Sequence, residues 1–235
     1  MSKRQIIAMG GGVLAPDSGY FELERYVVEA SGVQRPRIAY VGTASGDDPS
    51  HHTRFYEAYG HFDVHLATLT FFRRTPADLH AFVRDFDILH IGGGNTRSML
   101  AVWREWKFDE VLREAYRRGV VLCGSSAGSI CWFEAGITDS VAGDLLPLEC
   151  LGFLGGSNCP HYDGEKERRP VYQRLVREGR IAAGIGCDDG VALHFVDEKL
   201  ERIVSSRENA RAYRVEREAA GVAVETPLDV VALVR

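Results

Sequence analysis

Short apolar segments alternate with amphipathic segments over the first half of the chain. The apolar segments are rich in Ile, Val and Leu and are short enough for buried strands, whereas the segments between them carry apolar side chains at helical spacing. Strands are expected over 5–9, 37–42, 64–69, 87–94 and 120–124. Helices are expected over 20–32, 50–60, 96–103 and 109–119, with a further helix starting at Thr75-Pro76.

This alternation predicts an α/β fold. Near-continuous apolar strands separated by helices are typical of a mostly parallel sheet with helices on both faces. After residue 180 the pattern changes to short strands such as "GVALHF" and "RAYRVE", some of them expected to be antiparallel. No linker, repeat or low-complexity stretch interrupts the sequence, so a single domain over 1–235 is expected. In such folds ligands bind beyond the carboxyl ends of the strands.

Composition narrows the classes of function. The chain of 235 residues is 45% hydrophobic and 26% charged with a net charge of −5, and no apolar run reaches the ~18 residues of a membrane span. The acidic balance argues against a nucleic-acid partner, and the N-terminus lacks the shape of a signal peptide. Five cysteines without a CxxC pair suggest neither a disulfide framework nor a zinc site. A cytoplasmic protein without metal, cofactor or membrane partner is therefore expected.

The stretch "LCGSSAGSI" (122–130) carries the strongest chemical signal. Its GxSxG pattern, with a strand before it and a helix-compatible "SICWF" after it, matches a nucleophile elbow with Ser126 as the candidate nucleophile. At the start of a helix, the amide of Ala127 would face a developing oxyanion. In a chain with 25 glycines the same pattern can also be a plain strand-to-helix turn. Ser125 and Ser129 are expected to be packing or capping residues.

Two glycine-rich segments follow other expected strands. "IGGGNT" (91–96) would let a backbone approach a ligand closely and can offer a second oxyanion amide. It lacks the spacing of the GxGxxG and GK[ST] phosphate loops, so nucleotide binding is disfavoured. The similar "MGGG" (9–12) is expected to form a turn after the first strand, which could also border the pocket.

A serine nucleophile needs a base, and eight histidines are candidates. Five of them precede the elbow in helical or surface-like segments, and His90 and His194 lie in expected strands. His161 differs because it lies in the polar, loop-like "GGSNCPHYDGE" (155–165), directly after Pro160. Histidines in such loops are often merely exposed, but the order serine then histidine favours His161 as the base.

The third member of a triad should be a carboxylate that orients the imidazole and stabilises its cation. Asp139 follows the expected elbow helix, in a segment that could return to the sheet edge. Glu134 lies near the end of that helix and would reach His161 only if the helix ended early. Asp144 and Asp163 remain candidates, and any of the four can equally be a solvated surface carboxylate.

Together, "IGGGNT", "GSSAG" and "NCPH" resemble the peptidase E family of serine peptidases. Each motif alone is unspecific, whereas their combination is specific, and the resemblance is strongest over residues 87–165. The family comprises cytosolic dipeptidases whose fold is similar to that of class I glutamine amidotransferases, a flavodoxin-like fold, and cyanophycinases are relatives. The resemblance implies this fold and the hydrolysis of small peptides, and a homodimer would be similar to the habit of the family.

Carried over by motif, the resemblance implies four site residues. Ser126 would be the nucleophile and His161 the base, and the amides of Gly94 and Ala127 would form the oxyanion hole. The family takes its acid from the stretch after the elbow helix. Because the spacing of that stretch differs here, the first and second choices for the acid are Asp139 and Glu134.

Peptidase E proper cleaves dipeptides with an N-terminal aspartate, which an arginine downstream of the histidine reads. The resemblance therefore makes Arg168 and Arg169, in "DGEKERRP", candidates for substrate binding, although neither matches the family position cleanly. Asn95 in "IGGGNT" is a further candidate. An aspartyl preference therefore stays open.

These observations predict a serine peptidase of small peptides, and two alternatives stay open. An α/β-hydrolase esterase shares the GxSxG elbow but usually places its acid and histidine near the C-terminus. A catalytically idle binding protein on an amidotransferase-like fold would use the elbow as a structural turn. An amidotransferase proper is disfavoured because its elbow needs a cysteine, and Cys123 lies in the preceding strand.

Overall fold

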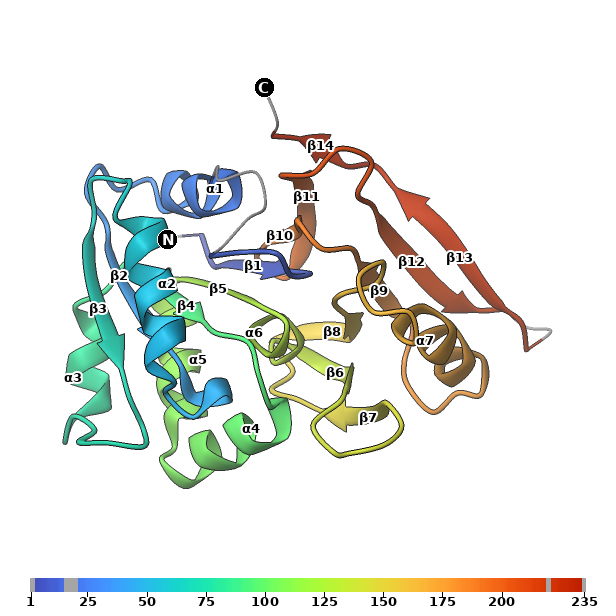
Figure 1. Cartoon of the computed structure of the whole chain (residues 1–235), viewed down its shortest axis with the longest axis horizontal. Coiled ribbons are helices and arrows are strands. Elements are labelled where there is room, and N and C mark those ends of the chain that lie inside the picture. Colours follow the sequence, from blue (N-terminus) through green and yellow to red (C-terminus); the bar gives the residue numbers. More distant parts are fainter. Residues whose placement is uncertain (1–2, 15–20, 219–220, 234–235) are drawn as a thin grey trace.

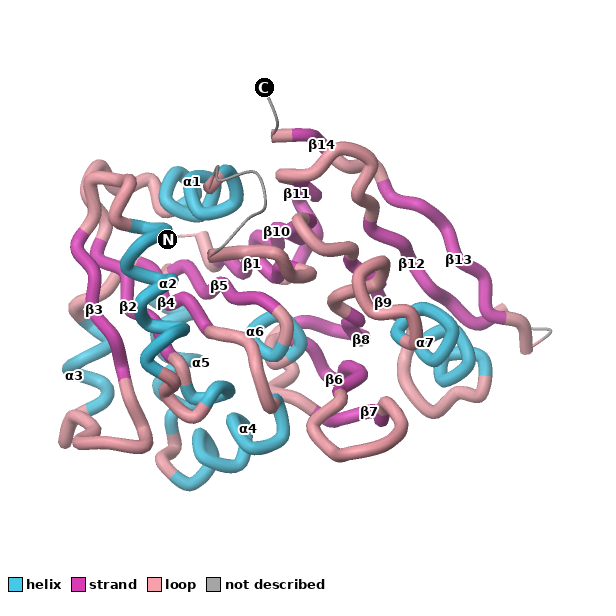
Figure 2. The backbone as a smooth tube through the Cα atoms, in the orientation of Figure 1, coloured by secondary structure: helices cyan, strands magenta, loops and turns pink. Residues whose placement is uncertain are grey.

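The computed structural model describes residues 3–14, 21–218 and 221–233. Over these ranges the chain forms two sheets with helices packed around them (Figure 1). Figure 2 shows that helices and strands alternate in the first half, whereas strands predominate in the second half. The α/β prediction is thereby confirmed. Tyr20, at the start of the helix expected over 20–32, lies outside the described residues.

The larger sheet contains the parallel core of the fold. Within the described residues it has eight strands, which are β1 (Gln5–Met9), β2 (Arg37–Val41), β3 (His65–Leu69), β4 (Ile88–Ile91), β5 (Val121–Ser125), β10 (Val191–Val196), β11 (Lys199–Ser205) and β14 (Val231–Ala232). Their order is β14-β11-β10-β1-β5-β4-β2-β3. The strands from β1 to β3 in this order pair in parallel, and β10 pairs antiparallel with β1 and β11.

The smaller sheet holds the strands that follow the elbow. Over the described ranges it has six strands, which are β6 (Phe133–Thr138), β7 (Leu146–Glu149), β8 (Leu154–Cys159), β9 (Gly184–Cys187), β12 (Ala212–Arg217) and β13 (Ala223–Leu228). β6, β8 and β9 pair in parallel, while β7, β12 and β13 add antiparallel strands at the two edges. The antiparallel strands expected after residue 180 are therefore present.

Helices cover both faces of the larger sheet. The described helices are α1 (Glu22–Ala30), α2 (Pro49–Tyr59), α3 (Leu79–Arg84), α4 (Thr96–Glu105), α5 (Phe108–Arg118), α6 (Ala127–Ile130) and α7 (Arg168–Arg177). Side chains of β1 alternate between the faces: Ile7 joins the core with Phe55 of α2, whereas Ile6 joins the core with Trp103 of α4. Among the described residues, every helix is too short or too polar to span a membrane.

Two helix boundaries differ from expectation. The helix expected to start at Thr75 begins at Leu79, because the side chain of Asp78 caps it by accepting from the amide of Ala81 at 2.8 Å. The helix after the elbow has four residues, and strand β6 starts at Phe133. This short helix decides where the following carboxylates lie.

Candidate active site

The turn at Ser126 is a strained elbow between β5 and α6. Ser126 has φ 55° and ψ −116°, a conformation that costs a non-glycine residue about 1–3 kcal/mol. A Cβ built on Gly124 would lie 2.5 Å from the carbonyl oxygen of Ile91, and one on Gly128 would lie 2.2 Å from it. The two glycines of the GxSxG pattern are thus required by close packing on β4.

The neighbouring serines have other partners or positions. Ser129 is buried, and its hydroxyl donates to Asn158 Oδ1 at 2.9 Å. Ser125 ends β5 and is paired with Met9 in the sheet. Their expected roles as packing residues agree with these contacts, and Ser126 alone occupies the elbow.

β1 brings Ser126 and His161 to the same place. The amide of Ser126 donates to the carbonyl of Met9 at 3.3 Å, and the amide of His161 donates to the carbonyl of Gly10 at 3.2 Å. Because Met9 and Gly10 are consecutive, the two residues meet at the carboxyl end of one central strand. Ligands bind at this edge in open α/β sheets. Ser126 and His161 are therefore both anchored at the carboxyl end of β1.

His161 forms a close pair with Asp189, a residue that the sequence reasoning missed. The ring Nδ1 of His161 lies 2.7 Å from Asp189 Oδ1, and both side chains are partly buried. The hydrogen bond from His161 lowers the pKa of Asp189 below its ordinary value, in opposition to the effect of partial burial. Asp189 is therefore a carboxylate that holds the imidazole with Nδ1 protonated, which leaves Nε2 free to act as a base.

The carboxylates expected to complete the triad lie elsewhere. The side chain of Asp139 is 64% exposed and lies 3.6 Å from Arg168. Glu134 is exposed on β6, where its Oε2 accepts from the amide of Gly156 at 2.8 Å. Both assignments are therefore corrected, because Asp189 lies at Nδ1 of His161. The short α6 sends the chain into β6 before Asp139 or Glu134 can approach the imidazole.

The other two candidates, Asp163 and Asp144, do not occupy Nδ1 of His161 either, because Asp189 does. Asp163 accepts from the backbone amide of Asp189 at 2.9 Å through its Oδ1. Asp144 is exposed in the loop between β6 and β7. The signal for Asp189 was "GCDDG" (186–190), two acidic residues and a glycine directly after a buried strand. Asp189 lies 28 residues after His161, beyond the four candidate carboxylates, which range from Glu134 to Asp163.

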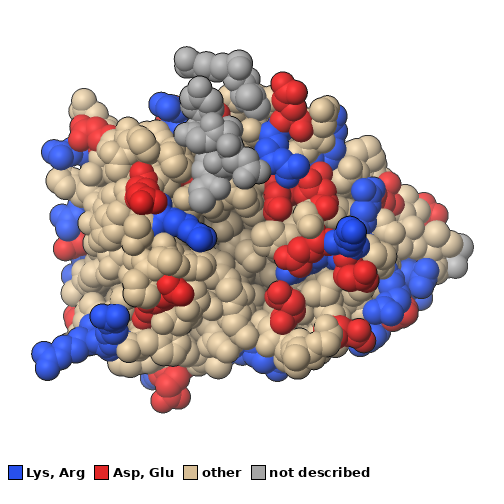
Figure 3. Space-filling model, viewed as in Figure 1, with Lys and Arg blue, Asp and Glu red and all other residues tan. Residues whose placement is uncertain are grey.

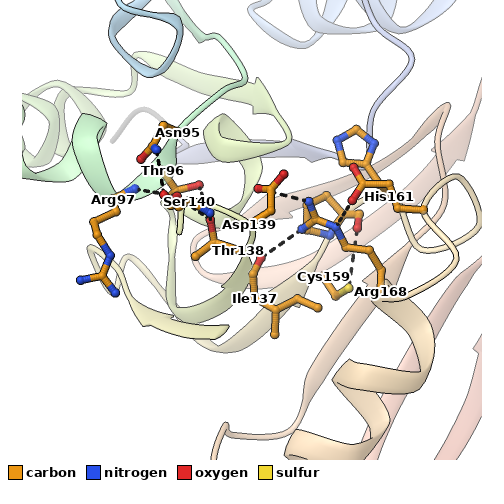
Figure 4. A network of polar contacts seen from close by, with 12 residues as sticks. Asn95, Thr96, Arg97, Ile137, Thr138, Asp139, Ser140, Cys159, His161 and Arg168 are labelled. Carbon is orange, nitrogen blue, oxygen red and sulfur yellow. Dashed lines mark hydrogen bonds and ion pairs between the residues drawn. The ribbon is translucent and has the colours of Figure 1, made fainter. Parts of the chain in front are cut away.

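The arginines expected to bind substrate are already engaged. The side chain of Arg168 is 2% exposed and contacts Glu165, Asp139 and the carbonyl of Ile137 (Figure 4). Arg169 pairs with Glu225 and lies over the ring of Tyr213. The two guanidinium groups therefore stabilise the connections of α7.

Asn95 has a structural role as well. Its Oδ1 accepts from the amide of Ser98 at 2.9 Å and so caps α4, and its Nδ2 donates to the carbonyl of Ser140 at 3.0 Å (Figure 4). These contacts fix the loop that starts at Gly92. They use both the oxygen and the nitrogen of the side-chain amide, so Asn95 orients the loop that borders Ser126.

The loop from Gly92 to Asn95 lies against the elbow. A Cβ on Gly93 would lie 3.1 Å from the Cβ of Ser126, and Gly94 has φ 135° with its α-carbon packed on the carbonyl of Ala44. Among the described residues, none accepts a hydrogen bond from the amides of Gly94 or Ala127. These are the two amides expected in the oxyanion hole, and both are available for a ligand oxygen.

The "MGGG" turn borders the site more closely than the sequence indicated. A Cβ on Gly11 would lie 2.1 Å from Asp189 Oδ1 and 2.4 Å from Cε1 of His161. Gly11 therefore forms the wall behind the histidine and the aspartate, and only hydrogen fits in the place of its side chain.

The charge around the site is uneven. On the face seen in Figure 3, acidic and basic side chains intermingle over the region where Figure 1 places β9 and β12. The surface over α6 is largely uncharged. Over the described ranges, no group of three or more His, Cys, Asp or Glu side chains is arranged to hold a metal ion.

Comparison with known proteins identifies the family. The sequence profile of peptidase family S51 matches residues 6–203. The chain belongs to peptidase family S51. The uncharacterized peptidase YgaJ of Bacillus subtilis (strain 168) is 49% identical over 212 residues, which cover 90% of this chain and 92% of that protein. The resemblance of the motifs to serine peptidases of the peptidase E type is thereby confirmed.

Two solved structures share the fold of this S51 peptidase. A peptidase from an acI-B1 Actinobacterium superposes with a TM-score of 0.72 at 16% identity, covering 97% of this chain and 95% of that one. A putative peptidase E protein from Listeria monocytogenes EGD-e superposes with a TM-score of 0.60 at 14% identity, covering 97% and 100%. At these identities the likeness extends to the fold alone.

Proposed function

We propose that this S51 peptidase hydrolyses small peptides, dipeptides above all, with Ser126 as nucleophile, His161 as base and Asp189 as the third member. The observation that carries the proposal is the His161–Asp189 pair. The backbone amide of His161 is bonded to Gly10, and that of the strained Ser126 is bonded to the preceding residue, Met9. A structural turn has no need of a serine at positive φ beside an oriented imidazole.

The reaction would proceed by acyl transfer. His161 Nε2 takes the proton of Ser126 as its oxygen attacks the scissile carbonyl, and Asp189 at Nδ1 stabilises the resulting cation. The negative oxygen of the tetrahedral intermediate accepts hydrogen bonds from the Gly94 and Ala127 amides. His161 then protonates the leaving amine, and water hydrolyses the acyl-serine by the same steps in reverse order.

Nδ1 of His161 is engaged by Asp189, so the bond to the hydroxyl of Ser126 would form from Nε2 as the substrate binds. Catalytic hydrogen bonds are commonly long before a substrate closes the site. The proposal of a small substrate rests on the resemblance of the motifs to the peptidase E family.

The chain order argues against an esterase of the α/β-hydrolase type. In that fold the order is serine, acid, histidine, whereas the order here is Ser126, His161, Asp189. An aspartyl preference would need a cation other than Arg168 or Arg169, since both are already paired.

A dipeptide library with mass-spectrometric readout tests the proposal. The wild-type protein should release amino acids from a subset of dipeptides, prefer them over p-nitrophenyl esters, and be labelled at Ser126 by a fluorophosphonate. Ser126→Ala should abolish both labelling and hydrolysis. A wild-type protein that neither hydrolyses any dipeptide nor reacts with the probe would instead be an idle binding protein.

A further inference from the structure

The residue that carries the Asp189 carboxylate is held at both ends of its backbone. Its amide donates to Asp163 Oδ1 at 2.9 Å, and its carbonyl accepts from Arg207 Nη1 at 2.9 Å. Arg207 Nη1 also lies 3.1 Å from Asp163 Oδ2, so the two side chains form an ion pair beside Asp189. We call Asp163 and Arg207 the backbone clamp of Asp189.

The clamp joins three segments that are distant in the sequence. Asp163 lies in the loop that carries His161, Asp189 lies in the turn after β9, and Arg207 lies in the loop between β11 and β12. Asp163 therefore ties the loop of the histidine directly to the turn of the aspartate. Arg207 closes the connection from a third side, through hydrogen bonds that charge strengthens.

The position of the Asp189 carboxylate depends on the position of the Asp189 backbone, because there is little free space around the carboxylate. A Cβ on Gly164 would lie 2.4 Å from Asp189 Oδ2, and the amide of Gly190 donates to the carbonyl of Gly11 at 2.9 Å. An aspartate side chain is short, so a displaced turn would move its carboxylate away from the ring of His161. Small displacements in an active site have large effects on rate.

We propose that Asp163 and Arg207 are positioning residues, which hold Asp189 against His161 and so keep the imidazole directed at Ser126. The inference rests on the proposed function. Their side chains are 33% and 50% exposed, and ion pairs with such exposure add little to the free energy of unfolding. The clamp therefore acts on the geometry of the site more than on the stability of the fold.

Several charges face this part of the site. His161, Arg207 and Arg168 each favour the charged form of Asp189, and Asp188 and Asp163 are the neighbouring acids. The hydrogen-bonded ring of His161 and the cations of Arg207 and Arg168 thus keep Asp189 in the carboxylate form that accepts from Nδ1.

The test is steady-state kinetics of the full chain on a dipeptide identified by the library. Asp163→Ala and Arg207→Ala should each lower kcat roughly 10- to 100-fold with KM little changed. Asp163→Asn keeps an oxygen for the Asp189 amide and Arg207→Lys keeps a cation, so both should lose less.

A second comparison asks whether the clamp acts through Asp189. In an Asp189→Asn background, adding Arg207→Ala should cost little more, because no carboxylate remains to be positioned. The matched control is the ion pair of Arg35 and Asp63, joined at 2.8 Å and exposed at the surface. Arg35→Ala should leave kcat unchanged.

Two results would overturn the inference: wild-type kcat in both alanine variants, or equal losses with and without Asp189. If the alanine variants fail to fold, Asp163→Asn and Arg207→Lys carry the same comparisons. An inactive Ser126→Ala beside unaffected clamp variants would remove this inference and leave the proposed function standing. A fully active Ser126→Ala would remove the proposed function itself.

Discussion

Substitution of Gly11 by alanine tests the geometry of the site from a residue that has no chemistry of its own. The new Cβ would lie 2.1 Å from Asp189 Oδ1 and 2.4 Å from Cε1 of His161, where ordinary contacts start at 3.4 Å. The side chains of His161 and Asp189 must therefore move away from residue 11 by about 1 Å or more. A misplacement of this size costs roughly 10²-fold in rate, so kcat on a dipeptide should fall by about that factor.

The same substitution should leave the protein folded. Overpacking of this kind costs about 1–3 kcal/mol of the free energy of unfolding, which a thermal melt would show as a lowered but cooperative transition. Gly155→Ala is the matched control, because a Cβ there meets no atom within 4 Å. Wild-type kcat in Gly11→Ala, with the melt unchanged, would mean that the His161–Asp189 pair is not part of the catalytic apparatus.

Three further predictions concern single side chains. Ser126→Ala should lower hydrolysis by ~10³ or more with the fold intact, and Ser129→Ala should cost far less, as measured on the same dipeptide. Asp189→Asn should lower kcat by up to ~10⁴ while Asp139→Asn stays near the wild-type rate, and the opposite ranking would restore the earlier choice of acid. Burial raises the pKa of Asp188 to about 6, so its contribution to stability is full below the unfolded value of about 3.9 and is lost as pH rises through about 6. Urea unfolding should thus show Asp188→Asn gaining stability relative to wild type between pH 4 and pH 7, and a constant difference would contradict the burial argument.

The parts of the site that depend on local sequence could be predicted from it. The elbow is a local feature, because a strand, a GxSxG turn and a helix start determine where Ser126 lies. His161 was found by its loop and by its order after the serine. The glycines at 92–94 were expected at a strand end, and they border the elbow there.

The proposed third member of the triad, Asp189, could not be predicted in this way. Asp189 approaches His161 because β9 and β8 are paired in parallel, so the residues that follow them lie together. That pairing is a property of the tertiary fold, and no periodicity in the sequence reports it. The length of α6 was misjudged for a similar reason: "SICWF" favours a helix locally, whereas pairing of Phe133 with β8 makes it a strand.

The carbonyl groups of Met9 and Gly10, which receive the amides of Ser126 and His161, have a consequence for biosynthesis. β1 is translated early, yet its neighbours in the sheet are β5 and β10, which end at Ser125 and Val196. A nascent chain that ends between Ser126 and Asp188 possesses the serine but neither the completed sheet nor Asp189. Catalytic competence should therefore arise abruptly and late, once long-range pairing closes around β1, and such pairing is slow to form. An incomplete chain on the ribosome would carry no peptidase activity.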